Sequence, residues 1–168
     1  MFIECNRIIH ISTNELELYR QCCETIISMG GYRFVWIGCV HYDAETSVRP
    51  VVYAGFEDGY LSSVKIAWGE HETGAGHTRR AISTKSPAIA RDLEEDFTDM
   101  WRDEAKRRGY ASSITIPLLY ESTVSCVLKI YSCEPDAFDR EEEELLTRMG
   151  EDMCYGAIAI RNAEHSRT

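Results

Sequence analysis

Hydrophobic and polar positions alternate most clearly near the C-terminal third of the chain. Two runs, SSITIPLLY at 112–120 and TVSCVLKIYS at 123–132, flank the short turn Glu121-Ser122. Successive side chains of a strand point to opposite faces of a sheet, so this pattern predicts a hairpin with one apolar and one mixed face. The mixed face carries Ser113, Thr115, Lys129 and Tyr131.

The remaining chain contains patterns of both periods. Apolar residues recur at helical spacing from about 15 to 29 and again from about 139 to 164. The β-branched and aromatic residues at 32–42 and 48–55 predict two neighbouring strands. Shorter patterns predict helices at 60–63, 77–84 and 97–108 and a strand at 88–92. This order favours the α+β class: a central antiparallel sheet with the N- and C-terminal helices on one face.

Helix boundaries and buried stripes follow from the same patterns. Ser12 and Glu15 fit a capping box, and Asp96 is expected to cap the helix that ends before Gly109. The stripe predicted for the first long helix is Leu16, Tyr19, Cys23, Ile26 and Ile27. The stripe predicted for the last helix is Leu145, Met149, Met153, Gly156 and Ile160.

Composition narrows the class of protein. The chain has 168 residues and a formal net charge of −10, which argues against nucleic acid or an anionic membrane as the main partner. Its apolar runs are shorter than a membrane span, and no signal peptide is recognised, so we expect a cytoplasmic protein. We expect one domain at 12–164, the end of a preceding signalling helix or linker at 1–11, and a tail at 165–168.

Seven cysteines are scattered along the chain without a CxxC pair. Structural zinc usually requires two close ligand pairs, so we expect no metal site. Cys22, Cys39 and Cys126 stand in apolar patterns, where cysteine behaves as a small hydrophobic residue. Reduced thiols in a core are therefore the expected state.

Five segments together resemble the GAF domain family, the small-molecule sensor modules of signalling proteins. They are GGYRFVWIG at 30–38, RPVVYAGF at 49–56, SSITIPL at 112–118, LKIYS at 128–132 and PDAFDREEEEL at 135–145. The likeness covers roughly residues 5–162. It is strongest to the GAF domains of prokaryotic sensor histidine kinases and diguanylate cyclases.

The resemblance implies separate roles for the two sheet faces. In GAF domains the first and last helices cover one face, and an insert between the middle strands covers a ligand pocket on the other. Here Ile114, Ile116, Leu128 and Ile130 would lie under the terminal helices. Ser113, Thr115, Lys129 and Tyr131 would form the pocket floor, with Trp68, His77, Phe97 and Trp101 as walls and lid.

Particular ligands of the family fit to different degrees. The cyclic-nucleotide signature needs an Asn in the insert, whereas asparagines occur here only at 6, 14 and 162. Covalent bilin attachment needs a cysteine before the insert histidine, and Gly76 precedes His77. Haem needs one axial ligand, which His71 or His77 would supply. No cofactor is required, and the ligand is left unidentified.

The family also contains an enzyme, free methionine sulfoxide reductase, which uses cysteines around the pocket. Residues 55–110 contain no cysteine, and strand parity turns Cys126 away from the pocket. The G-x-S-x-G, phosphate-loop and H-E-x-x-H motifs are also missing. We therefore expect that the domain is not an enzyme.

These observations predict a sensory input domain of a two-component or related signalling protein. An unidentified small molecule would bind under the insert, and the terminal helices, paired in a homodimer, would pass its presence to an effector. The alternative is a GAF domain without a ligand that acts as a dimerisation spacer, its pocket filled by its own side chains.

Overall fold

The computed structural model describes residues 1–43, 47–63, 76–96 and 99–166. Within these ranges the helices are α1 (Phe2–Ile11), α2 (Glu15–Gly30), α3 (Tyr60–Ser63), α4 (Gly76–Thr84), α5 (Leu93–Asp96), α6 (Asp99–Arg107) and α7 (Arg140–Ser166). The strands are β1 (Phe34–Val40), β2 (Val48–Gly55), β3 (Ala88–Ala90), β4 (Ser112–Tyr120) and β5 (Thr123–Ser132).

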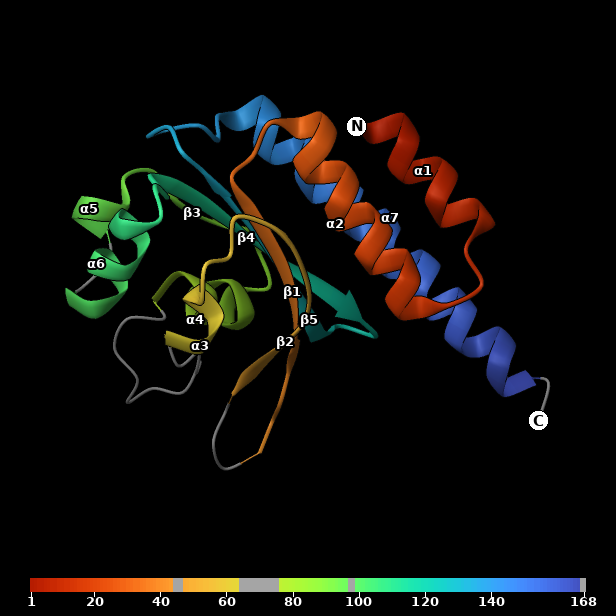
Figure 1. The fold of residues 1–168 in the computed structure, drawn as a ribbon. Coiled ribbons are helices and arrows are strands. Elements are labelled where there is room, and N and C mark those ends of the chain that lie inside the picture. The colour runs from red at the N-terminus through yellow and green to blue at the C-terminus, as the bar shows by residue number, and fades with distance from the viewer. Residues whose placement is uncertain (44–46, 64–75, 97–98, 167–168) are drawn as a thin grey trace.

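The strands described form one antiparallel sheet in the order β2-β1-β5-β4-β3. Helices α1, α2 and α7 lie on one side of this sheet, and α3 to α6 lie on the other (Figure 1). The predicted α+β architecture is therefore confirmed. β5 is the central strand, and because helices lie on both sides of the sheet, both of its faces are covered.

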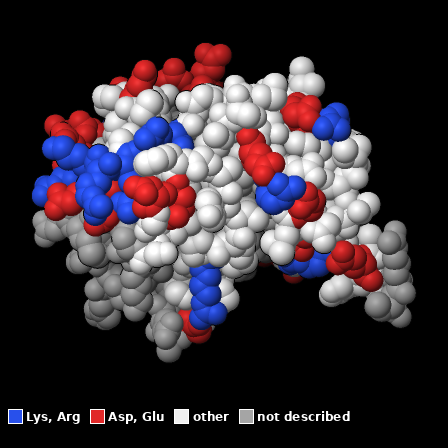
Figure 2. All heavy atoms as spheres, viewed as in Figure 1, with Lys and Arg blue, Asp and Glu red and all other residues white. Residues whose placement is uncertain are grey.

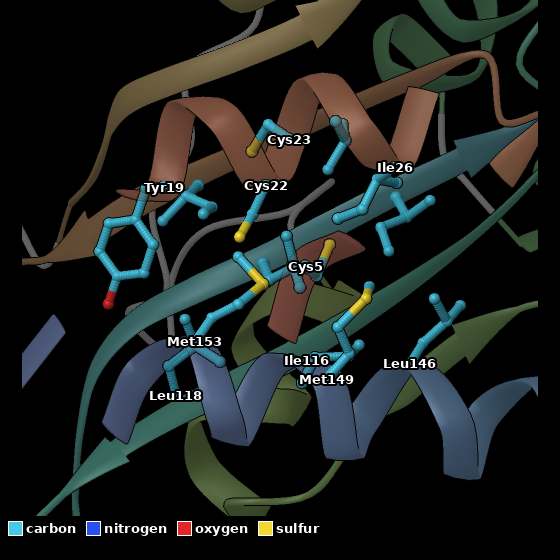
Figure 3. Packing of buried hydrophobic residues seen from close by; sticks show 14 of the residues in the cluster. Cys5, Tyr19, Cys22, Cys23, Ile26, Ile116, Leu118, Leu146, Met149 and Met153 are labelled. Atoms are coloured by element: carbon cyan, nitrogen blue, oxygen red, sulfur yellow. The ribbon is translucent and has the colours of Figure 1, made fainter. Parts of the chain in front are cut away.

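The hairpin faces are those that strand parity predicts. Ile114 pairs with Ile130 and Ile116 with Leu128, and all four are fully buried beneath the terminal helices. Cys126 belongs to the same apolar cluster. In Figure 3 sulfur-bearing side chains converge above β4, with Met149 and Met153 of α7 facing Cys5 and Cys22. The flexible thioethers of methionine suit such an irregular helix–sheet interface.

Two residues in left-handed conformation close the hairpin. Glu121 has φ 50° and Ser122 has φ 67°. Two consecutive positive φ values define the type I′ turn, whose twist matches that of paired strands. Neither residue is glycine or asparagine, so the hairpin retains conformational strain of about 1–2 kcal/mol per residue.

Helix α6 ends in a Schellman motif, which sets the position of the aromatic residue that follows. The Gly109 N–H donates to the Lys106 carbonyl at 3.1 Å, and the Tyr110 N–H donates to the Ala105 carbonyl at 3.0 Å. Gly109 has φ 77°, as the motif requires. Tyr110 and Ala105 are both buried in the apolar cluster on the insert side.

Two predicted helix caps are wrong. Ser12 ends α1, where its hydroxyl donates to the Ile8 carbonyl, and Asn14 caps α2 by accepting the Glu17 N–H at 2.9 Å. A capping residue must precede its helix in extended conformation, and only Asn14 does so. Asp96 is the last residue of α5 rather than the cap of the next helix.

The predicted buried stripes are each misplaced in one position. Leu16 is 57% exposed and Leu145 is 39% exposed. Leu18 and Leu146 are fully buried instead. Leu145 and Leu146 are adjacent and differ by only about 100° around the helix, so periodicity locates the apolar face but not its exact edge. Leu16 lies in the first turn of α2, about 200° from Leu18, and was assigned to the wrong side of the helix.

Candidate functional site

Two rows of side chains cross the sheet on the face covered by the insert, the segment between β2 and β4 that contains α3 to α6. The first row is Phe34, Tyr131, Ser113 and Ala90, and the second is Trp36, Lys129, Thr115 and Ala88. All eight residues are buried. Each row is aromatic on β1 and small on β3 and β4. The sheet therefore presents an aromatic half and a polar half, in which the side chains on β3 and β4 are small and those of Ser113 and Thr115 carry hydroxyl groups.

Helix α4 covers the polar half of this face. Thr78, Ala81 and Ile82 are its buried residues, and the helix contacts β3, β4 and β5. The Lys129 Nζ donates a hydrogen bond to the Thr78 Oγ1 at 3.2 Å. Thr78 lies in the first turn of α4, where unpaired backbone N–H groups create a partial positive charge. An ammonium group and a helix N-terminus thus converge on one buried point.

Burial lowers the pKa of Lys129 from 10.5 to about 7. Its side chain is 2% exposed, and the Nζ lies 5.6 Å from the centroid of the Tyr131 ring. Removing an ammonium ion from water disfavours its charged form, and ring contact compensates this only in part. At neutral pH Lys129 therefore exchanges readily between its charged and neutral forms.

Two hydroxyl groups next to Lys129 have no hydrogen-bond partner in the part of the chain that is described. They are Ser113 Oγ and Thr115 Oγ1, both fully buried. Thr115 pairs directly with Lys129 across β4 and β5, and Ser113 pairs with Tyr131. A buried hydroxyl without a partner costs about 1–3 kcal/mol. Groups of this kind mark positions where a bound polar molecule would be stabilised.

Stacked aromatic rings form the other half of the site. The Tyr131 ring lies 5.5 Å from Phe34 and 4.8 Å from Tyr110, and Tyr60 lies 5.1 Å from Tyr110. The Trp36 Nε1 donates to the Tyr131 hydroxyl at 3.3 Å. Burial raises the pKa of Tyr131 to about 12, so its hydroxyl stays protonated. The rings supply a rigid apolar wall beside the polar groups.

Arg108 holds the insert in place above these rings. Its guanidinium donates to the Asp58 carbonyl at 2.7 and 2.9 Å and to a Glu104 carboxylate oxygen at 2.6 Å. It also lies 5.6 Å from the centroid of the Tyr60 ring. The Tyr110 hydroxyl donates to the Phe56 carbonyl. These bonds join the end of α6 to the segment before α3.

The structure places only some of the predicted site residues. Ser113, Thr115, Lys129 and Tyr131 lie together on the insert-facing side, and His77 is half-buried in α4 beside Thr78. Trp68 and Phe97 lie outside the described residues. Trp101 belongs to α6, but its side chain is not among those described.

Sequence reasoning missed Thr78, Trp36, Tyr60, Tyr110 and Arg108. The parity that selected Lys129 and Tyr131 also places Trp36 and Phe34 on the same face, because β1 pairs with β5. Strand parity would therefore have identified Trp36 and Phe34 if the pairing of β1 with β5 had been known from the sequence. Thr78 and Arg108 carried no signal, because their contacts join segments about 50 residues apart.

Several charged groups on the surface form ion pairs. Figure 2 shows Lys and Arg side chains gathered with acidic ones over α5 and α6. Among them, Lys106 Nζ lies 3.0 Å from Glu94. Such exposed pairs contribute little to stability.

In the described ranges no helix has the length and apolarity to span a membrane. In the same ranges no group of three or more His, Cys, Asp or Glu side chains is arranged so that it could hold a metal ion.

The comparisons with known proteins agree on the fold. The family model described as GAF domain matches residues 12–154. Free methionine-R-sulfoxide reductase from Neisseria meningitidis, solved with its substrate, superposes with TM-score 0.77 at 15% identity, covering 96% of this chain and 89% of that one. No curated relative matches the chain in sequence.

Domains of two other proteins are also among the similar structures. The GAF domain of a phosphoenolpyruvate-protein phosphotransferase from Coxiella burnetii has TM-score 0.74 at 13% identity, covering 98% of this chain and 94% of that one. A domain of a putative two-component sensor histidine kinase protein from Sinorhizobium meliloti has TM-score 0.68 at 16% identity, covering 90% and 94%. Likeness at these identities shows the shared fold.

The prediction that the domain is not an enzyme is corrected by these comparisons. The reductase from Neisseria meningitidis superposes on this chain with TM-score 0.77, so the same fold is that of an enzyme in another protein. The sequence argument rested on the lack of cysteines between residues 55 and 110 and on the orientation of Cys126, and it gave no weight to Cys133 because that residue lies past the end of its strand. In the structure Cys133 is exposed and lines a small hollow with Arg102, Lys106 and Tyr110. An enzymatic role is therefore consistent with the fold.

Proposed function

The chain belongs to the GAF domain family, and we propose that it is a sensory input domain that binds a small anion between β4, β5 and α4. GAF domains commonly serve as regulatory modules of signalling proteins, and one of the similar structures is a domain of a putative two-component sensor histidine kinase protein. The observation that carries the proposal is the buried Lys129 amine beside two buried hydroxyls that lack partners among the described residues.

The physical chemistry of Lys129 selects the charge of the ligand. A carboxylate or phosphate in contact with the amine would favour its charged form and raise its pKa from about 7. The hydroxyls of Ser113 and Thr115 would donate to the same anion, as would backbone N–H groups in the first turn of α4. The stacked rings would contact the apolar part of the ligand.

A thermal-shift screen tests this proposal. The library contains small carboxylates and phosphate esters at pH 7, with haem included and followed by absorption. A ligand present at 100 times its Kd raises the free energy of unfolding by about 2.7 kcal/mol, which is easily detected. A stabilising anion supports the proposal. A screen without any stabiliser contradicts it and favours the alternative of a dimerisation spacer without ligand.

Variants then locate the binding site. Lys129→Met removes the charge and retains the length of the side chain, and it should weaken binding of the identified anion about tenfold or more. Lys106→Met is the matched control, because Lys106 is exposed and paired with Glu94. If the two variants bind equally well, the anion binds elsewhere.

We also propose that the domain pairs as a homodimer through α1 and α7. Ile3 is 84% exposed, Ile11 is 60% exposed and Tyr155 is 78% exposed. Ile9, Tyr155 and Ile160 line a groove between the two helices. Light scattering after size exclusion should give twice the mass of the chain, and Tyr155→Glu should give a monomer. A monomeric wild-type protein would contradict this pairing.

A second candidate function is reduction of a free sulfoxide, favoured by the superposition on the Neisseria reductase. Cys133 would be the nucleophilic thiol, because it is exposed and lies beside Lys106 and Arg102. An assay of methionine-R-sulfoxide reduction with a thiol reductant tests it. Activity that is lost in Cys133→Ser supports this candidate, and no activity in the wild type excludes it.

A further inference from the structure

Cys39 of β1 and Cys126 of β5 are directly opposite each other in the sheet. Both face the terminal helices, where Cys126 is part of the apolar cluster and Cys39 packs against it. Cys39 and Cys126 are the last pair of opposed residues between β1 and β5. No other cysteines are paired across strands in the described sheet.

The backbone hydrogen bonds show which kind of cross-strand pair this is. The His41 N–H donates to the Ser47 carbonyl at 2.8 Å, and the Arg33 carbonyl accepts from the Phe56 N–H at 2.9 Å. Alternate residues of a strand direct their backbone groups toward the same neighbouring strand, so counting back two residues from His41 places the backbone groups of Cys39 toward β2, where it pairs with Arg49, and not toward β5. Opposed residues at such positions have Cα atoms about 4.5 Å apart. This separation falls within the range of about 4.4–6.8 Å found in disulfides.

The two thiols also differ in reactivity. The Cys126 thiol donates a hydrogen bond to Cys39, which lowers the pKa of Cys39 to about 7. Nearby Arg161 acts in the same direction, whereas Glu15, its ion-pair partner, and burial oppose it. Cys39 is half-buried, and Cys126 is 7% exposed. Cys39 is therefore the thiolate that a small reagent reaches first, and Cys126 lies behind it.

We propose that Cys39 and Cys126 are a peroxide-responsive dithiol that closes into a cross-strand disulfide. The Cys39 thiolate attacks one oxygen of hydrogen peroxide, the O–O bond breaks, and hydroxide leaves to give a sulfenic acid. The Cys126 sulfur then loses its proton, attacks the Cys39 sulfur and displaces hydroxide. Two thiols are oxidised by two electrons in total, and one peroxide is reduced to two waters.

The remaining cysteines lack this combination of a close partner and access. Cys5, Cys22 and Cys23 have no exposed surface and lie between α1, α2 and the sheet (Figure 3). Cys154 is 3% exposed, and its thiol donates to the Leu119 carbonyl at 3.6 Å. Cys133 is exposed and provides the internal comparison for simple access.

The position of the pair gives the disulfide a route to the terminal helices. Cys126 shares its cluster with Tyr19 of α2 and Cys154 of α7. Drawing the two sulfurs together changes the surface on which these helices pack. Oxidation would thus act on the same helices as the proposed ligand, from the opposite face of the sheet.

Peptide mapping tests the dithiol in the wild-type protein. The protein is treated with hydrogen peroxide, alkylated under native and then denaturing conditions, and digested without reductant. We expect a cross-linked peptide that joins Cys39 to Cys126 and a fall from seven alkylatable thiols to five. In Cys126→Ser, a sulfenic acid at Cys39 should be trapped by dimedone.

Two variants that each replace a single cysteine are compared with the wild type to show which cysteines form the disulfide. Cys133→Ser should form the disulfide as the wild type does, and Cys39→Ser should lose it. Three outcomes overturn the proposal: Cys39 and Cys126 stay alkylatable while Cys133 is oxidised, Cys126 pairs with Cys154, or Cys39 links two chains. Because the cross-link is read in the wild type, an unfolded variant does not obscure the result.

Discussion

Replacing Lys129 by methionine should remove a pH-dependent cost from the stability of this domain. Methionine retains the unbranched stem and has no charge to bury. Lys129 is 2% exposed, and burial lowers its pKa from 10.5 in the unfolded chain to about 7 in the folded one. The folded state therefore binds fewer protons than the unfolded state between these two pH values.

The magnitude follows from linkage. Where the unfolded state binds more protons, the free energy of unfolding rises with pH. The lysine costs about 5 kcal/mol below pH 7, since each pKa unit corresponds to about 1.4 kcal/mol. At pH 9 the unfolded lysine is still charged, and the remaining cost is about 2 kcal/mol. The stability advantage of Lys129→Met should thus shrink by about 3 kcal/mol from pH 6 to pH 9.

Urea denaturation of both proteins at half-unit pH intervals measures this difference. Comparing the two proteins at each pH cancels the titration of tyrosines and cysteines that they share. Packing differences between the side chains add a constant that leaves the slope unchanged. Lys106→Met, at an exposed position, should show a difference that does not vary with pH.

A flat difference for Lys129→Met would refute the reasoning. It would mean that the Lys129 amine keeps an ordinary pKa in the folded protein, through water or an anion already bound. An affinity measurement provides a second check on the same group. Binding of an anion at Lys129 should be constant below pH 7 and weaken as the pH rises above it, because only the charged amine attracts the ligand.

Three further changes have defined outcomes. Glu121→Asn with Ser122→Gly should raise the free energy of unfolding by about 1 kcal/mol in urea denaturation, since both positions have positive φ; an unchanged value would exclude strain in the turn. Arg108→Met should lower it by about 2–4 kcal/mol because the Asp58 carbonyl loses its donors, whereas exposed Arg107→Met should change it by less than about 0.5. Gly109→Ala should lower the Tm, at a cost of about 1 kcal/mol, because Gly109 has φ 77°; an unchanged Tm would contradict the need for glycine at the end of α6.

Local sequence was sufficient for much of the fold. The hairpin, the second strand at 48–55 and the short helix at 60–63 appear where their patterns predict them. Each is determined by neighbouring residues, through strand alternation, turn chemistry or helical spacing. The caps at Ser12 and Asp96 failed because short helices preceded both positions, and a capping residue is recognised only relative to its own helix.

The candidate site was predicted in part, for a related reason. Parity placed Ser113, Thr115, Lys129 and Tyr131 on one face, which the register confirms. It did not indicate that α4 would bring Thr78 to the Lys129 amine, or that β1 would add Trp36 to the aromatic wall. Those contacts depend on strand order and on the packing of the insert.

By itself, the sequence determined the secondary structure, the division of each strand into two faces and the family. These properties are local, because a side chain's face depends only on its position along its own strand. The tertiary structure decided which elements cover each face of the sheet. Because α4 packs over the face that carries Lys129, this residue is a desolvated amine rather than a surface charge. It also decided that Cys39 meets Cys126 across two strands that are separated by about half of the chain. Burial and long-range pairing arise from packing the whole chain, and no local pattern encodes them.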